Sequence, residues 1–247
     1  FDKPIQLAEQ GFAVSPRMSQ SIEQNKESLQ RYPQTAAYFL PNGAPLAAGA
    51  VLKNPEFAQS MKLLAKEGSA PFYHGKPAQN MVNTITGVAD NPGKITLADF
   101  KNYRVIERTP VCSPYREYEV CGMGAPSSGG IALSQILGIL QTQDMKKLGT
   151  ENIHSWRWIG DASRVAFADR DYYVADPDFV TVPTKALISQ SYLNSRAQEI
   201  RATDKALPQI NAGKLSNQFA AGKPVELPST SHIVVVDKEG NVVSMTT

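Results

Sequence analysis

The chain has 247 residues, of which 42% are hydrophobic and 19% are charged. This balance suits one large or two modest globular domains and excludes an intrinsically disordered segment. The formal net charge is +2 and the basic residues are scattered along the sequence, so there is no electrostatic footprint for nucleic acid. We therefore expect a small-molecule or peptide substrate.

The first elements with clear boundaries lie between residues 54 and 99. Asn54 can cap a helix that starts at Pro55, apolar residues recur at 57, 61, 64 and 65, and Gly68 would stop that helix. Residues 72–75 are expected to form a turn. Thr96 and Asp99 form a capping box, with Asp in place of the preferred Glu, and predict the start of another helix. The first residues contain no apolar signal region, so the N-terminus does not indicate a compartment.

Strands are expected around residues 104–110 and in the segment from Cys112 to Cys121. Alternating polar and apolar residues predict a hairpin that turns near Arg116 and Glu117, which would place the two sulfurs opposite each other. A disulfide, which would imply an oxidising compartment, and two reduced, half-buried thiols are both compatible with this register. Two cysteines without a matching histidine cluster make a metal site unfavourable.

Two helices are predicted in the next part of the chain. A break over 124–130 leads into an apolar helix over 131–140, which falls well short of the roughly 20 residues that span a bilayer and is expected to be a core helix. The second helix is predicted over 152–168 and is expected to end at 169–170. One of its faces carries Trp156, Ile159, Ser163 and Ala166. A turn is expected over 176–179, because Pro177 removes a donor and disfavours helical angles before it.

From residue 205 to 228 the chain is polar and broken by closely spaced Pro and Gly residues, which predicts an exposed, poorly structured segment. It changes abruptly into a β-branched run over 231–237, which predicts a buried strand. Residues 238–241 predict a hairpin turn, and residues 242–247 the start of the return strand. A domain is not expected to end inside a central strand, because the unpaired backbone groups would stay unsatisfied.

Several other side chains have both a functional and a structural interpretation. The run over 127–130 lacks the Lys of a phosphate-binding loop and favours a helix N-terminus with tight backbone packing. The three histidines, His74, His154 and His232, are too widely spaced in the sequence for a metal triad. His232 is expected to be a structural neighbour of Thr230 and not a catalytic base. Trp156 and Trp158 are expected to be core and rim of one helix. Four aspartates at expected helix ends and turns favour capping over acid-base chemistry: Asp161, Asp169, Asp176 and Asp178.

The chemically suggestive feature is a cleavable loop that delivers Thr230 to the start of the hydrophobic strand. A threonine hydroxyl is a weak nucleophile unless a base lies beside it, and its own free α-amino group is one such base. That amine has a pKa of roughly 7.7–8.0, whereas a peptide nitrogen is not basic. The chain would therefore have to be cut between Ser229 and Thr230, by attack of the same hydroxyl on the Ser229 carbonyl. From spacing alone this signal is weak, because Thr before a strand is common.

A resemblance that runs over most of the chain strengthens the signal. Four motifs occur in the order in which they occur in the γ-glutamyltranspeptidases: Pro-Ser-Ser-Gly-Gly-Ile at 126–131, Val-Ala-Phe-Ala-Asp-Arg at 165–170, Asp-Pro-Asp-Phe-Val at 176–180, and the run from 230 to 244 that begins Thr-Ser-His-Ile. Residues 72–75 and 107–110 also resemble stretches of the family's large subunit. Several ordered motifs are much stronger evidence than any single one.

The resemblance implies an α+β fold, the four-layer αββα sandwich of the N-terminal-nucleophile hydrolases, incomplete in this chain. It implies that residues 1–229 belong to a large subunit and residues 230–247 form the first strands of a small subunit, both cut from one precursor and associated as a heterodimer. Thr230 falls on the family's nucleophile, and autocleavage falls between Ser229 and Thr230. The implied reaction passes a γ-glutamyl group, as from glutathione, through a glutamyl-threonine ester to water or an amino acid.

Other functional groups of the family would lie outside this chain. The resemblance places the oxyanion-hole glycines, the groups that hold the glutamyl α-amino and α-carboxylate, the loop over the pocket and a supporting second threonine beyond Thr247, and a substrate-binding arginine before Phe1. One oxyanion donor is typically worth about 2.7–4 kcal/mol of transition-state stabilisation. This piece alone is therefore expected to turn over little or nothing, and the activity is expected of the complete protein.

Two rival functions stay open beside γ-glutamyl transfer and hydrolysis. One is an acylase of the same fold that acts on a cephalosporin-type substrate or on poly-γ-glutamate, and the other is a scaffold without turnover. No metal or organic cofactor is expected, because the nucleophile, the base and the oxyanion donors would all come from the polypeptide. The resemblance implies a periplasmic or secreted protein, since most bacterial members of the family are exported.

Overall fold

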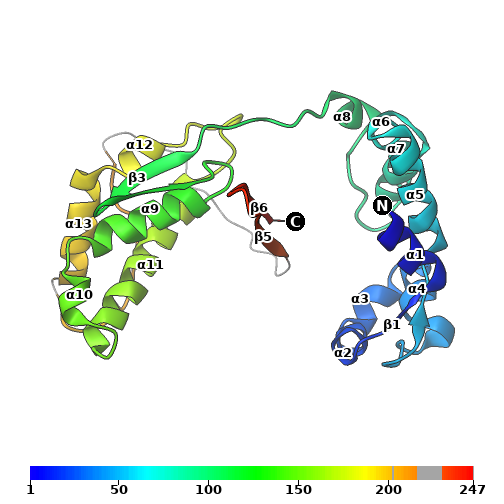
Figure 1. The fold of residues 1–247 in the computed structure, drawn as a ribbon, viewed down its shortest axis with the longest axis horizontal. Helices are drawn as coiled ribbons and strands as arrows, with labels where there is room; N and C mark the ends of the chain where they lie inside the picture. Colours follow the sequence, from blue (N-terminus) through cyan, green and yellow to red (C-terminus); the bar gives the residue numbers. More distant parts are fainter. Residues whose placement is uncertain (202, 216–229, 247) are drawn as a thin grey trace. The chain divides into compact units, whose positions relative to one another are not determined.

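The computed structural model describes residues 1–201, 203–215 and 230–246. The chain divides into two compact units, Phe1–Val105 and Ile106–Thr247, and each has its own elements. Helices dominate both, and the strands of the described residues pair as antiparallel two-stranded sheets (Figure 1). In these residues, no helix is both long and apolar enough to cross a membrane.

The first unit consists of short helices and one small sheet. Its elements are α1 (Asp2–Gln10), β1 (Phe12–Ala13), α2 (Pro16–Gln24), α3 (Lys26–Gln30), α4 (Pro33–Phe39), the 3-10 helix η1 (Pro41–Gly43), β2 (Val51–Leu52), α5 (Pro55–Glu67), α6 (Ala70–His74), α7 (Lys76–Thr86) and α8 (Leu97–Asn102). α1 packs along α5, and the backbone N–H of Asn54 donates to the Ala8 carbonyl at 2.8 Å. Strands β1 and β2 pair with Phe12 opposite Leu52.

Two predicted helices of this unit are confirmed. Asn54 Oδ1 accepts a hydrogen bond from the Phe57 N–H at 2.9 Å and so caps α5, which ends before Gly68 at a φ of 73°. Thr96 Oγ1 accepts from the Asp99 N–H at 3.3 Å, and the Asp99 carboxylate accepts from the Thr96 N–H at 2.7 Å, so the capping box of α8 forms. The Thr96 hydroxyl also donates to the Asp99 carboxylate at 2.7 Å, and this bond together with the one from the Thr96 N–H lowers the pKa of the Asp99 carboxyl.

The turn predicted over 72–75 is wrong, because residues 72–74 belong to α6. Pro71 is compatible with the first turn of a helix, where its missing N–H is not needed. The helix also gives its aromatic residues partners: Tyr73 stacks on Tyr103 with ring centroids 5.7 Å apart. Gly75 follows directly as the end of α6.

The strand predicted around residues 104–110 is also wrong, since these residues form neither helix nor strand. Arg104 Nη1 donates to the carbonyl oxygens of Lys101 and Tyr103 at 2.8 and 2.7 Å, and Val105 is 85% exposed. A strand needs a neighbour to pair its backbone groups. The local sequence pattern does not show whether another strand lies alongside these residues.

The second unit is built around one apolar helix. Its elements are β3 (Val111–Tyr115), β4 (Tyr118–Gly122), α9 (Gly129–Leu140), α10 (Met145–Leu148), α11 (Ile153–Tyr173), α12 (Thr184–Leu187), α13 (Gln190–Arg201), β5 (His232–Val236) and β6 (Val242–Thr246). Helix α9 contacts α11, α13 and the hairpin of β3 and β4 (Figure 1). The core consists of Ile131, Ile139, Leu140, Trp158, Ala162, Val165, Tyr173, Leu187, Tyr192, Leu193, Ala197 and Ile200.

The predicted apolar helix is confirmed as α9, and so is its tightly packed N-terminus. A β-carbon at Gly130 would lie 2.4 Å from the Met123 carbonyl oxygen, which accepts a hydrogen bond from the Gly130 N–H at 3.1 Å. Ser113 Oγ on β3 donates to Ser134 Oγ on α9 at 2.9 Å, and both residues are buried. Backbone contact and a buried hydrogen bond therefore fix α9 on the hairpin.

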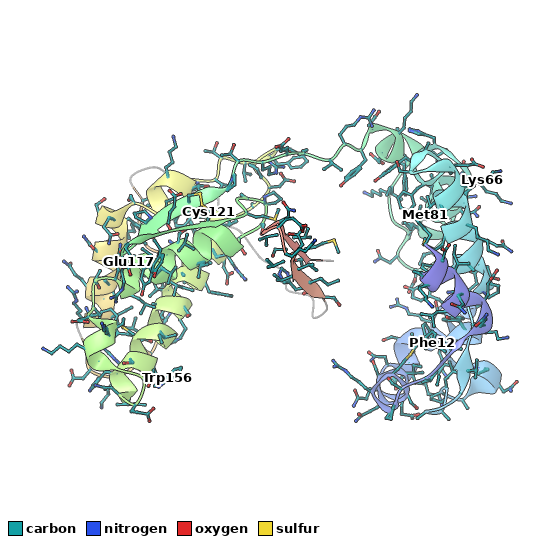
Figure 2. All side chains as sticks on the ribbon, viewed as in Figure 1. Phe12, Lys66, Met81, Glu117, Cys121 and Trp156 are labelled. Carbon is teal, nitrogen blue, oxygen red and sulfur yellow. A yellow bond between two sulfur atoms is a disulfide. The ribbon has the colours of Figure 1, made fainter. Side chains whose placement is uncertain are left out.

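The helix predicted over 152–168 forms, but it continues to Tyr173 as α11. One tryptophan belongs to the core and one to the rim, but in the reverse of the predicted order: Trp158 is 5% exposed, whereas Trp156, labelled in Figure 2, is 58% exposed. The face defined by Trp156, Ile159, Ser163 and Ala166 is buried only at Ala166. The buried side carries Ser155, Trp158, Asp161, Ala162, Val165, Ala166, Asp169 and Tyr173. Helices α9 and α13 contact α11, and these neighbours decide which side is covered.

The cysteine hairpin has the predicted register. Cys112 lies opposite Cys121, and the turn falls at Arg116, which has a φ of 56°, and Glu117. The two sulfurs form a disulfide, so of the two alternatives that the sequence left open the structure has the bridged one.

The segment predicted to be exposed and poorly structured over 205–228 is only partly described. Residues 205–215 form no regular element, as predicted, and six of them are exposed, but the other five are half-buried or buried. Four of them pack against the core of the second unit: Leu207, Ile210, Ala212 and Leu215. Residues 216–228 lie outside the described residues.

The hairpin predicted to follow is confirmed, but its predicted burial is wrong. β5 pairs with β6 from His232 opposite Thr246 to Val236 opposite Val242. Every strand residue is exposed, and Val234 reaches 60%. A continuous apolar run predicts cover on both faces, but that cover must come from other segments, and the described ones do not supply it.

Candidate functional site

Thr230 lies two residues before β5, outside any strand, and is exposed. In the part of the chain that the structure describes, no side chain forms a hydrogen bond with it. Its predicted cleavage partner Ser229 lies outside the described residues. Within the described residues, Thr230 is therefore an exposed residue whose side chain has no hydrogen-bond partner.

His232, the first residue of β5, is held by two hydroxyl groups of β6. Its Nδ1 lies 2.8 Å from Thr246 Oγ1, and its Nε2 lies 3.0 Å from Ser244 Oγ. A neutral imidazole has one donor and one acceptor nitrogen, and a hydroxyl can complement either. Both ring nitrogens are therefore engaged within the hairpin, in agreement with the predicted role of a structural neighbour.

The turn of the hairpin is held by one aspartate. Asp237 Oδ1 accepts hydrogen bonds from the N–H groups of Glu239 and Asn241 at 3.0 and 2.8 Å, and Oδ2 accepts from Asn241 Nδ2 at 2.8 Å. The bonds from Asn241 lower the pKa of the Asp237 carboxyl. Gly240 has a φ of 86°, a conformation that suits glycine. Local bonds thus shape the hairpin that carries Thr230.

Two of the aspartates predicted to be caps are not caps, because α11 runs past them. Asp161 and Asp169 lie on its buried side and are 2% and 0% exposed. Asp176 has the predicted turn role, since its Oδ1 accepts from the Asp178 N–H at 3.0 Å. Asp178 lies 3.8 Å from Arg108 in a loose, partly exposed ion pair, which contributes little to stability.

The carboxylate of Asp169 is buried and has four polar partners among the described residues. It accepts hydrogen bonds from Gln135 Nε2 and Tyr192 OH at 2.9 Å each and from the Gly213 N–H at 2.8 Å, and Arg196 Nη2 lies 3.2 Å away. Burial raises the pKa of Asp169, while Arg196 and the three hydrogen bonds oppose that rise. Burial also raises the pKa of Tyr192. The arrangement joins α9, α11, α13 and residue 213.

The sequence contains a signal for this network that the capping interpretation missed. Asp161 and Asp169 fall at helical spacing from Trp158, Ala162 and Val165, on the same face. A charged residue at an apolar position of a helix predicts a buried partner of opposite charge. For Asp169 that partner is Arg196, which is 3% exposed, whereas Asp161 pairs with the partly exposed Arg164.

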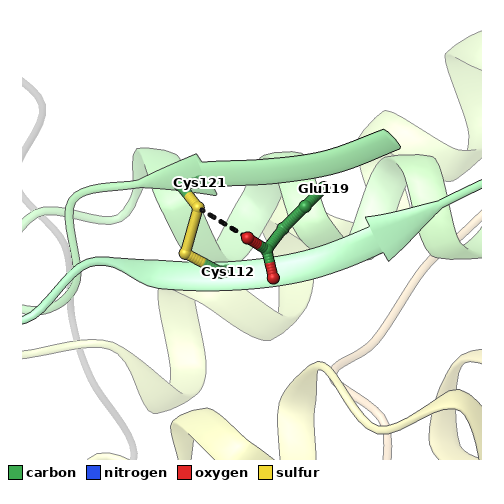
Figure 3. Close-up of side chains that lie close together, drawn as sticks. All are labelled: Cys112, Glu119 and Cys121. Atoms are coloured by element: carbon green, nitrogen blue, oxygen red, sulfur yellow. Dashed lines mark hydrogen bonds between the residues drawn. A yellow bond between two sulfur atoms is a disulfide. The ribbon is translucent and has the colours of Figure 1, made fainter. Parts of the chain in front are cut away.

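One group of potential metal ligands lies close together in the described residues. Figure 3 shows Glu119 beside the disulfide of Cys112 and Cys121, with Glu119 Oε2 4.0 Å from Cys121 Sγ. A disulfide sulfur carries no proton, so this approach is a contact and not a hydrogen bond. Because metals bind the thiolate form, the bridged pair does not fit a metal ion. The three histidines lie on three separate elements, α6, α11 and β5.

Comparison with known proteins places these observations in a family. The model of the Gamma-glutamyltranspeptidase family matches residues 1–247. The chain is 37% identical over 245 residues to the glutathione hydrolase proenzyme of Escherichia coli (strain K12), with 98% of this chain and 40% of that protein covered. It is 38% identical over 242 residues to the Acylase ACY 1 proenzyme of Pseudomonas sp. (strain SE83), with 98% and 41% covered.

The fold is similar as well. The crystal structure of Helicobacter pylori gamma-glutamyltranspeptidase matches with a TM-score of 0.78 and 31% identity, over 87% of this chain and 63% of that chain. This likeness confirms the predicted α+β fold of the N-terminal-nucleophile hydrolases. The chain spans 40–41% of the length of the two curated relatives above.

Proposed function

This chain belongs to the gamma-glutamyltranspeptidase family, and from that premise we propose that the complete protein transfers or hydrolyses γ-glutamyl groups with Thr230 as its nucleophile. One observation carries the proposal: Thr230 is exposed immediately before a strand that local hydrogen bonds define. A hydroxyl placed there is open to a carbonyl carbon from outside the hairpin. It also becomes N-terminal after a single cut.

The proposed first reaction is self-cleavage of the precursor. Thr230 Oγ attacks the Ser229 carbonyl carbon, the C–N bond breaks, and the acyl group moves from nitrogen to oxygen as an ester. Water then opens the ester, which leaves a carboxylate on Ser229 and a free α-amino group on Thr230. Residues 1–229 become the end of one subunit and Thr230 the start of the other, and the two remain associated as a heterodimer.

The proposed catalytic cycle uses the amine made by that cut. The α-amino group of Thr230 takes the proton of its own hydroxyl, because its pKa of roughly 7.7–8.0 lies close to working pH. The hydroxyl oxygen attacks the γ-glutamyl amide, the amine of the substrate leaves with the proton, and a glutamyl-threonine ester forms. Water or the amino group of an acceptor then takes the acyl group. No metal or organic cofactor enters any of these steps.

His232 has a positioning role in this scheme. Its ring bridges Ser244 and Thr246 across the hairpin, and it stands two residues after the nucleophile. It therefore fixes the strand from which Thr230 projects, and the amine of Thr230 supplies the base.

A second candidate function rests on the identities. Acylase ACY 1 is as similar to this chain, at 38%, as the glutathione hydrolase of E. coli at 37%. An acylase that opens another side-chain amide, such as a cephalosporin-type substrate or poly-γ-glutamate, would use the same nucleophile. A panel of purified substrates separates the two, since a γ-glutamylase should prefer glutathione and γ-glutamyl anilides by a large factor in kcat/KM.

We also propose a periplasmic or secreted location. The exposed disulfide between Cys112 and Cys121 supports it, because disulfides persist in oxidising compartments. Fractionation of cells that express the complete protein tests the location, and recovery of all of it in the reducing cytoplasm would contradict it.

The decisive experiment compares the complete protein with its Thr230→Ala, Thr230→Ser and Ser231→Ala variants. Intact mass and N-terminal sequencing report the cut, and release of the chromophore from a γ-glutamyl anilide reports turnover. Thr230→Ala should remain one chain and lose activity by at least about 10³-fold, as enzymes do without their nucleophile. Thr230→Ser keeps a hydroxyl and an amine and should still cleave, while Ser231→Ala is the matched neighbouring control and should behave as wild type.

Three outcomes would overturn the proposal in different ways. A small subunit that begins at another residue would remove Thr230 from both roles. Turnover that survives Thr230→Ala would reject Thr230 as the catalytic nucleophile, and if the variant is also uncut it would show that turnover does not need the cut. Clean cleavage without turnover of any amide in the panel would support a scaffold instead of an enzyme.

A further inference from the structure

A cavity of about 440 Å³ lies beside the disulfide hairpin of the second unit and is here called the Arg108 pocket. Its walls come from residues 106–110, which precede β3, and from residues 121–127, which end β4 and lead into α9. Cys121, labelled in Figure 2, shows where the hairpin contributes to it. The volume falls within the roughly 300–1,000 Å³ of small-molecule sites, so the pocket is large enough for a small ligand.

The walls of the Arg108 pocket are mainly apolar. Four apolar side chains line it: Ile106, Pro110, Met123 and Pro126. Ile106 is 55% exposed and Met123 is 67% exposed. Exposed apolar side chains that gather around a cavity are typical of ligand-binding grooves. The walls therefore favour a ligand with an apolar body.

The connection between β4 and α9, which forms one wall, is held by backbone packing. Gly124 is buried, and a β-carbon there would lie 3.1 Å from Val111 Cγ2 on β3. The Gly130 N–H of α9 donates to the Met123 carbonyl at 3.1 Å. A site that is formed before its ligand arrives binds with a smaller loss of conformational entropy. This wall therefore needs little rearrangement to accept a ligand.

The polar groups of the Arg108 pocket are donors without close partners. The Arg108 side chain is 27% exposed, and its Nη2 lies 3.8 Å from Asp178 Oδ2, which is too far for a hydrogen bond. Neither the Arg108 guanidinium nor the hydroxyl of the half-buried Ser127 forms a hydrogen bond with any residue that the structure describes. A guanidinium can bind a carboxylate through two parallel N–H···O bonds. The pocket thus combines apolar walls with a place for an anion.

We propose that the Arg108 pocket binds a small amphipathic carboxylate, with Arg108 and Ser127 at its carboxylate and the side chains of Ile106 and Met123 against its apolar body. Within the described part of the chain, no second cationic side chain lines the pocket. A single negative charge therefore fits better than the double charge of a phosphate group. The inference does not rest on the proposed function, because it concerns binding and not turnover.

The test uses the complete protein and 4-phenylbutanoate, which joins an apolar ring and chain to one carboxylate. A titration followed by ligand-observed NMR measures the Kd, and a ligand of this size should bind with a Kd on the order of 1 mM. The neutral analogue 4-phenylbutanamide has the same apolar body without the charge. It should bind about tenfold or more weakly, because it lacks the charge-assisted hydrogen bonds to the guanidinium.

Three variants locate the binding. Arg108→Gln should weaken 4-phenylbutanoate by about 10- to 100-fold and leave the affinity for the neutral amide nearly unchanged. Asp178→Asn removes the carboxylate that competes for Arg108 and should tighten the acid by up to about fivefold. Arg104→Gln is the matched control, since it removes a guanidinium from the same stretch of chain outside the pocket lining, and it should bind as wild type does.

The thermal unfolding midpoint accompanies each titration. Arg108 and Asp178 form only a loose, partly exposed ion pair, so their variants should unfold at the wild-type temperature. Failure of wild-type protein to bind the acid at 10 mM, as when another part of the protein fills the pocket, would overturn the proposal. So would equal affinity of wild type and Arg108→Gln for the acid, or equal weakening by Arg108→Gln and Arg104→Gln.

Discussion

Two apolar segments of the second unit have opposite environments. Ile131 and Ile139 on α9 are 0% exposed, whereas Val234 and Val236 on β5 are 60% and 63% exposed. Both segments are strongly hydrophobic in sequence. The difference is that α11, α13 and a hairpin surround α9, while the described residues leave both strands of the β5–β6 hairpin uncovered. A run of apolar residues favours burial of the element, but the packing of other segments against it determines whether it is buried.

The two regions are therefore held together differently. The α9 region combines apolar packing with a buried polar network around Asp169. The β5–β6 hairpin depends on its own backbone pairing, on His232 and on the Asp237 turn. Substitutions in the α9 region should lower the free energy of unfolding strongly, and substitutions in the β5–β6 hairpin should change it little in this chain.

The largest effect is expected from Asp169→Ala. It leaves the buried Arg196 with the partly exposed Glu199 as its remaining charge partner and removes the acceptor of Gly213 and Tyr192, so the free energy of unfolding should fall by about 3–5 kcal/mol. Urea denaturation measures the change. Asp171→Ala is the matched control, because its partner Arg170 is only a neighbouring residue and the pair is partly exposed, and it should cost at most about 1 kcal/mol. Equal effects of the two would show that the network contributes little.

A direct comparison of the two regions uses Leu193→Ala and Val235→Ala. Leu193 is 2% exposed and packs against Gly138, where an added β-carbon would lie 2.3 Å from Leu193 Cδ1. Its truncation should cost about 2–5 kcal/mol. Val235 is 53% exposed, and its truncation should cost less than about 1 kcal/mol. A large fall in the free energy of unfolding for Val235→Ala would mean that strand β5 is covered in solution.

The two hairpins differ in covalent structure, and reduction sharpens that difference. Cys112 and Cys121 close a loop with a sequence separation of 9, for which the chain-entropy relation gives about 2–3 kcal/mol. Chemical denaturation with and without reductant should show that reduction lowers the free energy of unfolding by that amount. The double variant Cys112→Ser with Cys121→Ser should match the reduced protein and should not respond to reductant. A response of that double variant would assign the change to something other than the bridge.

The smallest effect is expected from acidification of the β5–β6 turn. The pKa of Asp237 is lowered in the folded hairpin by Asn241, so the carboxylate contributes stability above its ordinary pKa, and that contribution is lost as pH falls through the lowered value. Amide exchange of residues 239–241 should therefore accelerate, beyond its intrinsic pH dependence, only in strongly acidic solution. Asp237→Ala should remove that excess, and an unchanged profile in the variant would refute the role of the carboxylate.

The sequence was most informative where the interaction is local. The Asn54 cap, the Thr96–Asp99 capping box and the turn at Asp237 all join residues within four positions of each other, so composition and spacing suffice to predict them. The cysteine hairpin belongs to the same class, since its register follows from alternation across a short turn. The ordered motifs likewise identified the family and, through it, the fold.

The candidate site was predictable only in part. The sequence proposed Thr230 and Ser229, and the structure describes Thr230 as exposed before β5 while Ser229 lies outside the described residues. The network of Asp169 and Arg196 was not predicted, because its members come from α9, α11, α13 and Gly213 and meet only when these segments pack.

The sequence by itself thus determined the Asn54 and Thr96 helix caps, the register of the cysteine hairpin and the family. Tertiary structure alone decided which face of α11 is buried, that residues 207–215 dock on the core, and that β5 stays exposed among the described residues. The physical reason is range: caps and turns depend on atoms a few residues apart, whereas burial and the pairing of buried charge depend on which distant segments arrive as neighbours.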